Sequence, residues 1–139
     1  MRQFTGLLGF DTPGRGLLEV TAEVTAWVRE KPLREGLLTI FCRHTSASLL
    51  IQENAALAVR HDLEAFFADL APEAPGRYRH DDEGPDDMPA HIRAALTPVQ
   101  LSIPLIGGRL ALGTWQGLYL FEHRRAPHRR ELALHLLGE

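Results

Sequence analysis

The sequence predicts an α+β fold, in which a mostly antiparallel sheet packs with two or three helices in one compact domain, residues 1–139. Two observations predict this class. β-prone runs with period-2 alternation occur in both halves of the chain, whereas the helical spacing of apolar residues is confined to segments before residue 97. The length of 139 residues fits one domain and is enough to bury about two-thirds of the unfolded surface.

Strands and helices alternate in the first part of the chain. We expect a short strand at 17–20, followed by a helix from Thr21 to about Glu30. Two β-prone runs follow at 36–44 and 46–53, separated by a polar break. In the first of them, Leu38, Ile40, Cys42 and His44 alternate onto one face.

A longer helix is predicted from Asn54, a plausible N-cap, to about Leu70. Its apolar residues have the spacing of one buried stripe: Val59, Leu63, Phe66, Phe67 and Leu70. The next segment, 71–89, contains four prolines and an acidic cluster, and we interpret it as a surface loop.

The remainder of the chain begins with a short helix and continues as strands. Pro89 suits the first turn of that helix, which carries His91. The glycine pair Gly107-Gly108 favours a hairpin turn. Four strands are expected around these features: 99–105, 109–112, 114–123 and 131–137.

Composition excludes several classes of protein. The single cysteine, Cys42, cannot form a disulfide within the chain, and its place in an apolar strand indicates an inert buried thiol. A net charge of −3 argues against a nucleic-acid partner that relies on a basic field. No apolar run approaches the roughly 18 residues of a membrane span, and the N-terminus lacks a secretory core. We therefore expect a cytoplasmic protein without nucleic-acid or membrane partners.

Three of the seven histidines are candidates for a metal site. His44 ends a strand, His80 opens the acidic loop, and His91 lies on the short helix that closes this loop. Imidazole is the commonest metal ligand in proteins, and a strand end, a loop and a helix start can converge. The alternative is that each histidine is an ordinary hydrogen-bonded or surface residue, and the spacing leaves both interpretations open.

The carboxylates also allow two interpretations. The acidic cluster within 81–87 is typical of a solvated charge run, but its oxygens could also bind Mg²⁺. Glu122 ends an apolar strand on the face of Gln116, Leu118 and Leu120. Its carboxylate is therefore expected either in water at the sheet edge or in a polar site.

The loop 124–130 concentrates four arginines and one histidine. Guanidinium groups match phosphate oxygens, so a small phosphorylated ligand is one interpretation; a solvated loop that offsets the acidic cluster is the other. The segment 113–117 adds the hydrogen-bonding residues Thr114 and Gln116 beside Trp115, whose residue type is usually found in the core of β proteins.

Four segments together resemble the YjbQ family, which carries the label secondary thiamine-phosphate synthase. They are FCRHTSASLLIQENA (41–55), YRHDDEGPDDMPAHIRAAL (78–96), SIPLIGGRLALGTWQGLYLFEHR (102–124) and the closing Gly138-Glu139. The resemblance covers nearly the whole chain in order, and its His-Thr-Ser-Ala, Pro-Ala-His and Gly-Thr-Trp-Gln signatures are highly specific. It implies a compact α+β homotrimer with a polar cleft between subunits.

The resemblance also implies a set of site residues. The recurring histidines of the family fall on His44, His80 and His91, which we expect to bind a divalent metal ion, Zn²⁺ or Mg²⁺. His44 is also a catalytic candidate, and Glu122 is expected as a general base or as a group that orients ligands. The expected contacts to an anionic substrate are Ser46, Thr114, Gln116 and Arg130.

The chain departs from the family pattern at four positions. Gln52 stands where the family usually has Asn, and Ala56 where it has Asp; Pro127 and His128 replace glycines. Because glycine permits a close backbone approach that proline and histidine do not, these last two changes argue against a backbone contact to phosphate in this loop.

The function implied by the resemblance is the joining of a pyrimidinylmethyl diphosphate to a thiazole phosphate, with release of pyrophosphate, as a low-level activity. A departing diphosphate needs its charge neutralised by a metal ion or by arginines. Two alternatives remain open: a metal- or anion-binding homotrimer, and a metal-dependent hydrolase of a phosphorylated metabolite.

Overall fold

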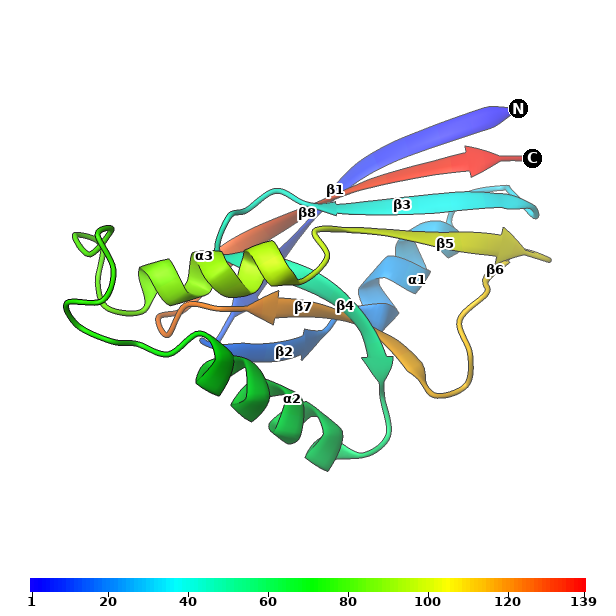
Figure 1. Ribbon diagram of the computed structural model, residues 1–139. Coiled ribbons are helices and arrows are strands. Elements are labelled where there is room, and N and C mark those ends of the chain that lie inside the picture. The colour runs from blue at the N-terminus through cyan, green and yellow to red at the C-terminus, as the bar shows by residue number, and fades with distance from the viewer.

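The computed structural model describes residues 1–139 and confirms the α+β class. Eight strands and three helices follow along the chain (Figure 1): β1 (Arg2–Thr12), β2 (Gly16–Glu19), α1 (Thr21–Arg29), β3 (Gly36–Cys42), β4 (Ala47–Glu53), α2 (Leu57–Leu70), α3 (Asp87–Leu96), β5 (Gln100–Ile106), β6 (Arg109–Leu110), β7 (Gln116–Glu122) and β8 (His128–Gly138). None of the helices combines the length and the apolar character needed to cross a membrane.

The strands form two sheets in which every pairing is antiparallel. The larger sheet has the order β1-β8-β3-β5-β6, and the smaller has the order β2-β7-β4. The chain termini lie side by side at one end of the larger sheet, because β1 pairs with β8 along its whole length (Figure 1). This confirms the predicted antiparallel sheet.

The main core lies between the two sheets and α1. Alternate residues of β3 and β8, such as Leu38 and Leu136, meet Leu118 and Leu120 of β7 and Val24 of α1 there. The intervening residues of β7 point the other way, where Tyr119 and Phe121 pack against α2, which covers the outer face of the smaller sheet. Both faces of β7 are thus buried.

The strand β1 has no counterpart in the sequence-based prediction. Its inward residues are Phe4, Gly6, Leu8 and Phe10, so a glycine interrupts the apolar alternation that marks a strand. A Cβ at Gly6 would collide with the indole of Trp27, which occupies this space. Trp27 of α1 therefore fills the apolar position that Gly6 leaves empty, and the sequence of β1 alone does not show the full apolar alternation.

The predicted start and buried stripe of α2 are wrong in part. The helix begins at Leu57, and the side chain of Asn54 donates to the carbonyls of Thr114 and Gln116 instead of capping the helix. Leu63 and Phe67 pack against the smaller sheet, but Phe66 and Leu70 are more than half exposed. One edge of the stripe therefore faces solvent.

Candidate metal centre

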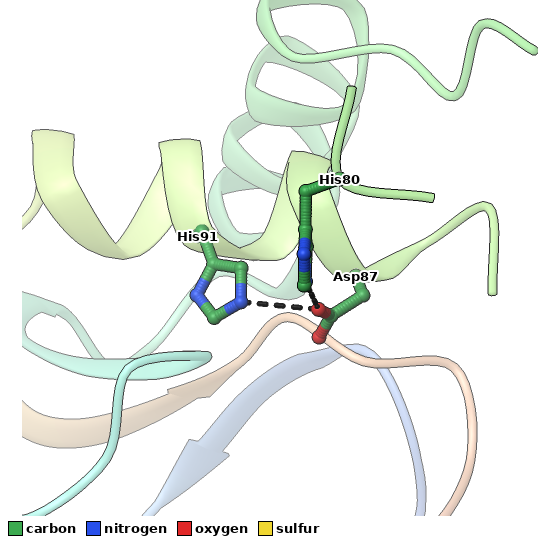
Figure 2. Close-up of side chains that lie close together, drawn as sticks. All are labelled: His80, Asp87 and His91. Atoms are coloured by element: carbon green, nitrogen blue, oxygen red, sulfur yellow. Dashed lines mark hydrogen bonds and ion pairs between the residues drawn. The ribbon is translucent and has the colours of Figure 1, made fainter. Parts of the chain in front are cut away.

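Three side chains converge where α3 begins. Asp87 is the first residue of α3, and His91 follows four residues later, so both lie on one face of the helix. The loop before α3 folds back and brings His80 against the same carboxylate (Figure 2). The site is thus built from one helix face and the loop that precedes it.

The nitrogens of the two imidazoles meet at one carboxylate oxygen. His80 Nε2 lies 2.7 Å from Asp87 Oδ2, and His91 Nε2 lies 3.1 Å from it. One ligand atom from each of the three residues lies within 4.8 Å of the others. Two imidazoles and a carboxylate are a donor set that suits Zn²⁺ and other divalent first-row ions.

Contacts with Thr45 and Arg124 hold these three side chains in place. His91 Nδ1 lies 2.9 Å from the carbonyl oxygen of Thr45; because a carbonyl only accepts, Nδ1 carries the hydrogen and Nε2 faces Asp87. Asp87 Oδ1 contacts Arg124 Nη1 at 2.9 Å, and Asp86 holds the same guanidinium through Nε. Oriented imidazoles and carboxylates of this kind are typical of metal sites.

The electrostatics of the cluster follow from these contacts. The hydrogen bond with Asp87 raises the pKa of His80, and the nearby acidic loop adds to this effect. Partial burial by itself would raise the pKa of Asp87, but contacts with His80, His91 and Arg124 outweigh it and lower that pKa. The carboxylate therefore stays ionised, as a metal ligand must.

A second group of donors shares His80. Asp82 and Glu83 approach the same imidazole, and all three residues of this group are exposed. No second imidazole or arginine holds these two carboxylates, which fits the solvated acidic run. The group that contains Asp87, which is almost fully buried, is the better-ordered candidate.

His44, also expected as a ligand, is not among the three converging side chains. Its Nε2 accepts the backbone N–H of Glu131 at 2.8 Å. Burial, and then the charge of Arg130, lower the pKa of His44. His44 and His91 instead line one hollow of about 290 Å³, whereas His80 lines a separate cavity of about 230 Å³. The three predicted histidines are therefore neighbours, but only two form the cluster.

Glu122 lies in a polar site and has no exposure to solvent. Its carboxylate accepts Arg130 Nε at 2.6 Å, contacts Arg130 Nη2, and accepts the hydroxyl of Thr12 at 2.7 Å. Arg130 Nη2 also donates to Ser46 Oγ at 3.0 Å. Burial would raise the pKa of Glu122, but these hydrogen bonds lower it. This geometry suits a group that orients its neighbours, whereas a general base needs access to substrate.

Thr114 and Gln116 lie apart from the other predicted residues. Gln116 begins β7 and Glu122 ends it, so they are separated by about 20 Å of strand. Gln116 Oε1 accepts the backbone N–H of Gly113 across the turn, and Trp115, expected in the core, is largely exposed. Within one chain, these residues do not reach the histidine cluster.

Sequence reasoning considered Asp87 and Arg124 only as members of charged segments and singled out neither as a site residue. Asp87 belongs by sequence to the acidic run, and Arg124 to the Arg-rich loop. The signal that could have separated Asp87 is its spacing of four residues from His91 on one predicted helix. Nothing in the local sequence marks Arg124, because its partners Asp86 and Asp87 lie almost 40 positions away.

Comparisons with known proteins give the same family over nearly the whole chain. The family model UPF0047 protein YjbQ-like matches residues 8–139. UPF0047 protein sll1880 of Synechocystis is 52% identical over 138 residues, which cover 99% of this chain and 94% of that protein. YjbQ of Escherichia coli O157:H7 is 41% identical, with coverages of 95% and 96%.

Solved structures show the same arrangement. The hypothetical protein APE1520 from Aeropyrum pernix K1 superposes with a TM-score of 0.87 at 31% identity, covering 98% of this chain and 99% of that one. The conserved hypothetical protein TT1486 from Thermus thermophilus gives a TM-score of 0.84 at 36% identity, with coverages of 95% and 99%. Sequence and fold agree, and the chain belongs to the YjbQ/UPF0047 family.

Proposed function

We propose that this protein is an enzyme that uses a divalent metal ion, held by His80, Asp87 and His91, to act on a small phosphorylated metabolite. The observation that carries the proposal is the convergence of His80 Nε2 and His91 Nε2 on Asp87 Oδ2. The carbonyl of Thr45 orients His91, and the guanidinium of Arg124 orients Asp87. Structural Zn²⁺ sites usually have four protein ligands, whereas three leave a position for substrate.

The specific reaction we propose is thiamine-phosphate synthesis, as the family resemblance implies. A bound divalent ion would supply Lewis-acid stabilisation of the negative charge on the departing diphosphate. The chain itself contributes the imidazole and carboxylate ligands, and Arg124 keeps Asp87 turned toward the histidines. The cavity beside His80, lined by Tyr78, Pro85 and Met88 among others, offers room for an organic group next to this site.

Hydrolysis of a phosphorylated metabolite is the second candidate. Two histidines and one carboxylate also form the ligand set of many hydrolytic metal centres, so the same residues support both reactions. The third possibility, a metal-binding homotrimer without significant turnover, differs from both because it predicts bound metal and no product.

One experiment separates these candidates. The purified protein and its His91→Ala variant are loaded with Zn²⁺ or Mg²⁺, their metal content is measured, and each is assayed for thiamine phosphate and for free phosphate. We expect about one ion per wild-type chain, thiamine phosphate as product, and loss of both in the variant. Phosphate release without coupling favours the hydrolase; metal-dependent activity that survives His91→Ala contradicts the proposed centre.

We further propose that the chain self-associates as a homotrimer through the outer face of the larger sheet. Leu7, Leu37, Phe41 and Leu137 share this face, are 38–57% exposed, and have no helix over them. The row of Thr5, His135 and Thr39 lies between these apolar side chains on the same face, and such a mixture of apolar and polar residues is typical of protein interfaces. Light scattering should give the mass of three chains for wild type and a smaller mass for Phe41→Asp, whereas Phe66→Asp on α2 should leave the mass unchanged.

A further inference from the structure

The hydrogen bond at His44 fixes the position of its proton. A backbone N–H can only donate, so His44 Nε2 accepts from Glu131 and carries no hydrogen. An imidazole with a bare Nε2 is neutral and has its hydrogen on Nδ1. His44 therefore presents a fixed N–H donor and keeps no lone pair on Nδ1 for a metal ion.

This donor remains open to a ligand. His44 Nδ1 has no partner in the chain, and the only buried side-chain nitrogen or oxygen without a hydrogen bond is His123 Nδ1. His44 Nδ1 is thus accessible to solvent, and His44 lines the hollow that it shares with His91. The hollow is lined by His44, Thr45 and His91 beside small apolar residues, and its lining contains no carboxylate.

The chemistry of this hollow points to an anionic oxygen. The acidic side chains that act on His44 are already paired, because Glu131 contacts Arg43 and Glu122 contacts Arg130. Asp87, which contacts His91 of the same lining, is paired with Arg124. A fixed donor and a hydroxyl, without a competing carboxylate, suit a phosphate oxygen better than a cation. The hollow also borders His91, so a phosphate seated there would lie next to the candidate metal centre.

We propose that His44 is a neutral hydrogen-bond donor, through Nδ1, to a phosphate oxygen of the ligand, and that it is not a metal ligand. This inference rests on the proposed function for the identity of the neighbouring ion. It assigns His44 to the ligand and leaves the metal to His80, Asp87 and His91. Glu131, through its backbone N–H, is the positioning group that selects the tautomer.

Nitrogen-15 spectroscopy of the histidine rings tests the tautomer and needs no bound metal ion. Across pH 6–8, we expect His44 to show a protonated Nδ1 and a bare Nε2, before and after Zn²⁺ is added; loss of this signal in His44→Gln assigns it. The opposite tautomer, an imidazolium at neutral pH, or transfer of Zn²⁺ onto Nδ1 would each overturn the inference.

Two variants test the ligand contact. An Asn side chain places an amide donor near the Nδ1 position, whereas a Gln side chain places its amide near Nε2. We expect both His44→Asn and His44→Gln to bind Zn²⁺ within about three-fold of wild type. Inorganic phosphate, titrated into Zn²⁺-loaded protein after unbound ion is removed, should bind about ten-fold or more weakly to His44→Gln, with His44→Asn closer to wild type.

The outcomes separate this inference from the metal proposal. A loss of Zn²⁺ affinity in His44→Gln equal to that in His91→Ala makes His44 a ligand and overturns the inference, while the metal proposal stands. If wild type binds no Zn²⁺, the metal proposal fails, and the phosphate titration of metal-free protein decides about His44. Equal affinities of wild type and His44→Gln, or no binding by either, then overturn the inference.

Discussion

Two carboxylates near the end of β7 have opposite surroundings. Glu122 is sealed and fully satisfied by Arg130, Thr12 and a backbone N–H, so it has no capacity for a new partner. Asp87 is also buried, but its partners His80 and His91 are partly exposed, and their Nε2 atoms face it. The sealed cluster, Glu122 with Arg130 and Thr12, can only stabilise the fold. The open cluster, Asp87 with His80 and His91, can exchange its contacts for a metal ion.

Arg124 joins the two clusters. Its backbone N–H donates to Glu122 Oε1 at 3.0 Å, and its guanidinium contacts Asp86 and Asp87. The hydrogen bond with Asp86 raises the pKa of Arg124, so its charge persists. Glu122 thereby fixes the backbone at Arg124, whose side chain orients Asp87. Substitutions in the two clusters should have separable effects.

The largest expected effect is on stability, from Glu122→Ala. This change leaves the guanidinium of Arg130 buried without its carboxylate, which costs about 3–5 kcal/mol of unfolding free energy. Denaturant unfolding measures it. The double variant Glu122→Leu with Arg130→Met should recover much of the loss, because no charge is then left unpaired; a single variant within about 1 kcal/mol of wild type would contradict the sealed cluster.

Asp87→Asn should mainly affect metal binding. It removes the ligand charge but keeps the shape, so we expect Zn²⁺ affinity to fall at least about a hundred-fold, with less loss of stability than in Glu122→Ala. Titration calorimetry measures the affinity. Asp82→Asn is the matched control, because Asp82 belongs to the exposed donor group, and it should stay within about three-fold of wild type; the reverse ranking would place the ion in that group.

Arg124→Gln should have a smaller effect on metal affinity, a decrease of about ten-fold. The carboxylate remains, but Asp87 loses the contact that turns it toward the histidines. Removing the guanidinium also leaves the charge of Asp86 unpaired beside the site, which favours a cation and keeps the net decrease below that of Asp87→Asn. Arg125→Gln, next along the chain and paired through its side chain with Glu73, should leave Zn²⁺ affinity unchanged. Equal affinities in the two variants would show that Arg124 does not orient Asp87.

The contrast between the two clusters also explains what the sequence could predict. β8 is evident from the alternation of its own residues, and β7 from a continuous run of apolar, β-prone residues. The residues of the sealed cluster can be named singly, but their pairing depends on the register of distant strands, as for Ser46 and Arg130. Asp87 is hidden among neighbouring acidic residues, because only tertiary contacts distinguish a buried carboxylate from a solvated one.

The histidines differ in the same way, since His123 is sealed whereas His80 is exposed. Burial, and then the charge of Arg93, lower the pKa of His123 to about 3. Below the unfolded value of about 6.5, the unfolded chain binds a proton that the folded chain does not, so this residue makes stability fall as the pH falls from about 6.5 toward 3.

The expected slope from His123 is about 1.4 kcal/mol per pH unit, with no contribution above about pH 7. Denaturant unfolding between pH 7 and 4 measures it, with His123→Phe as the comparison. Phenylalanine removes the titrating group but keeps a ring against Phe121, and it leaves the hydroxyl of Ser48 without its imidazole partner. The variant should be less stable at pH 7, and its stability should fall less steeply with acid. Parallel pH profiles would show that His123 titrates normally in the folded chain.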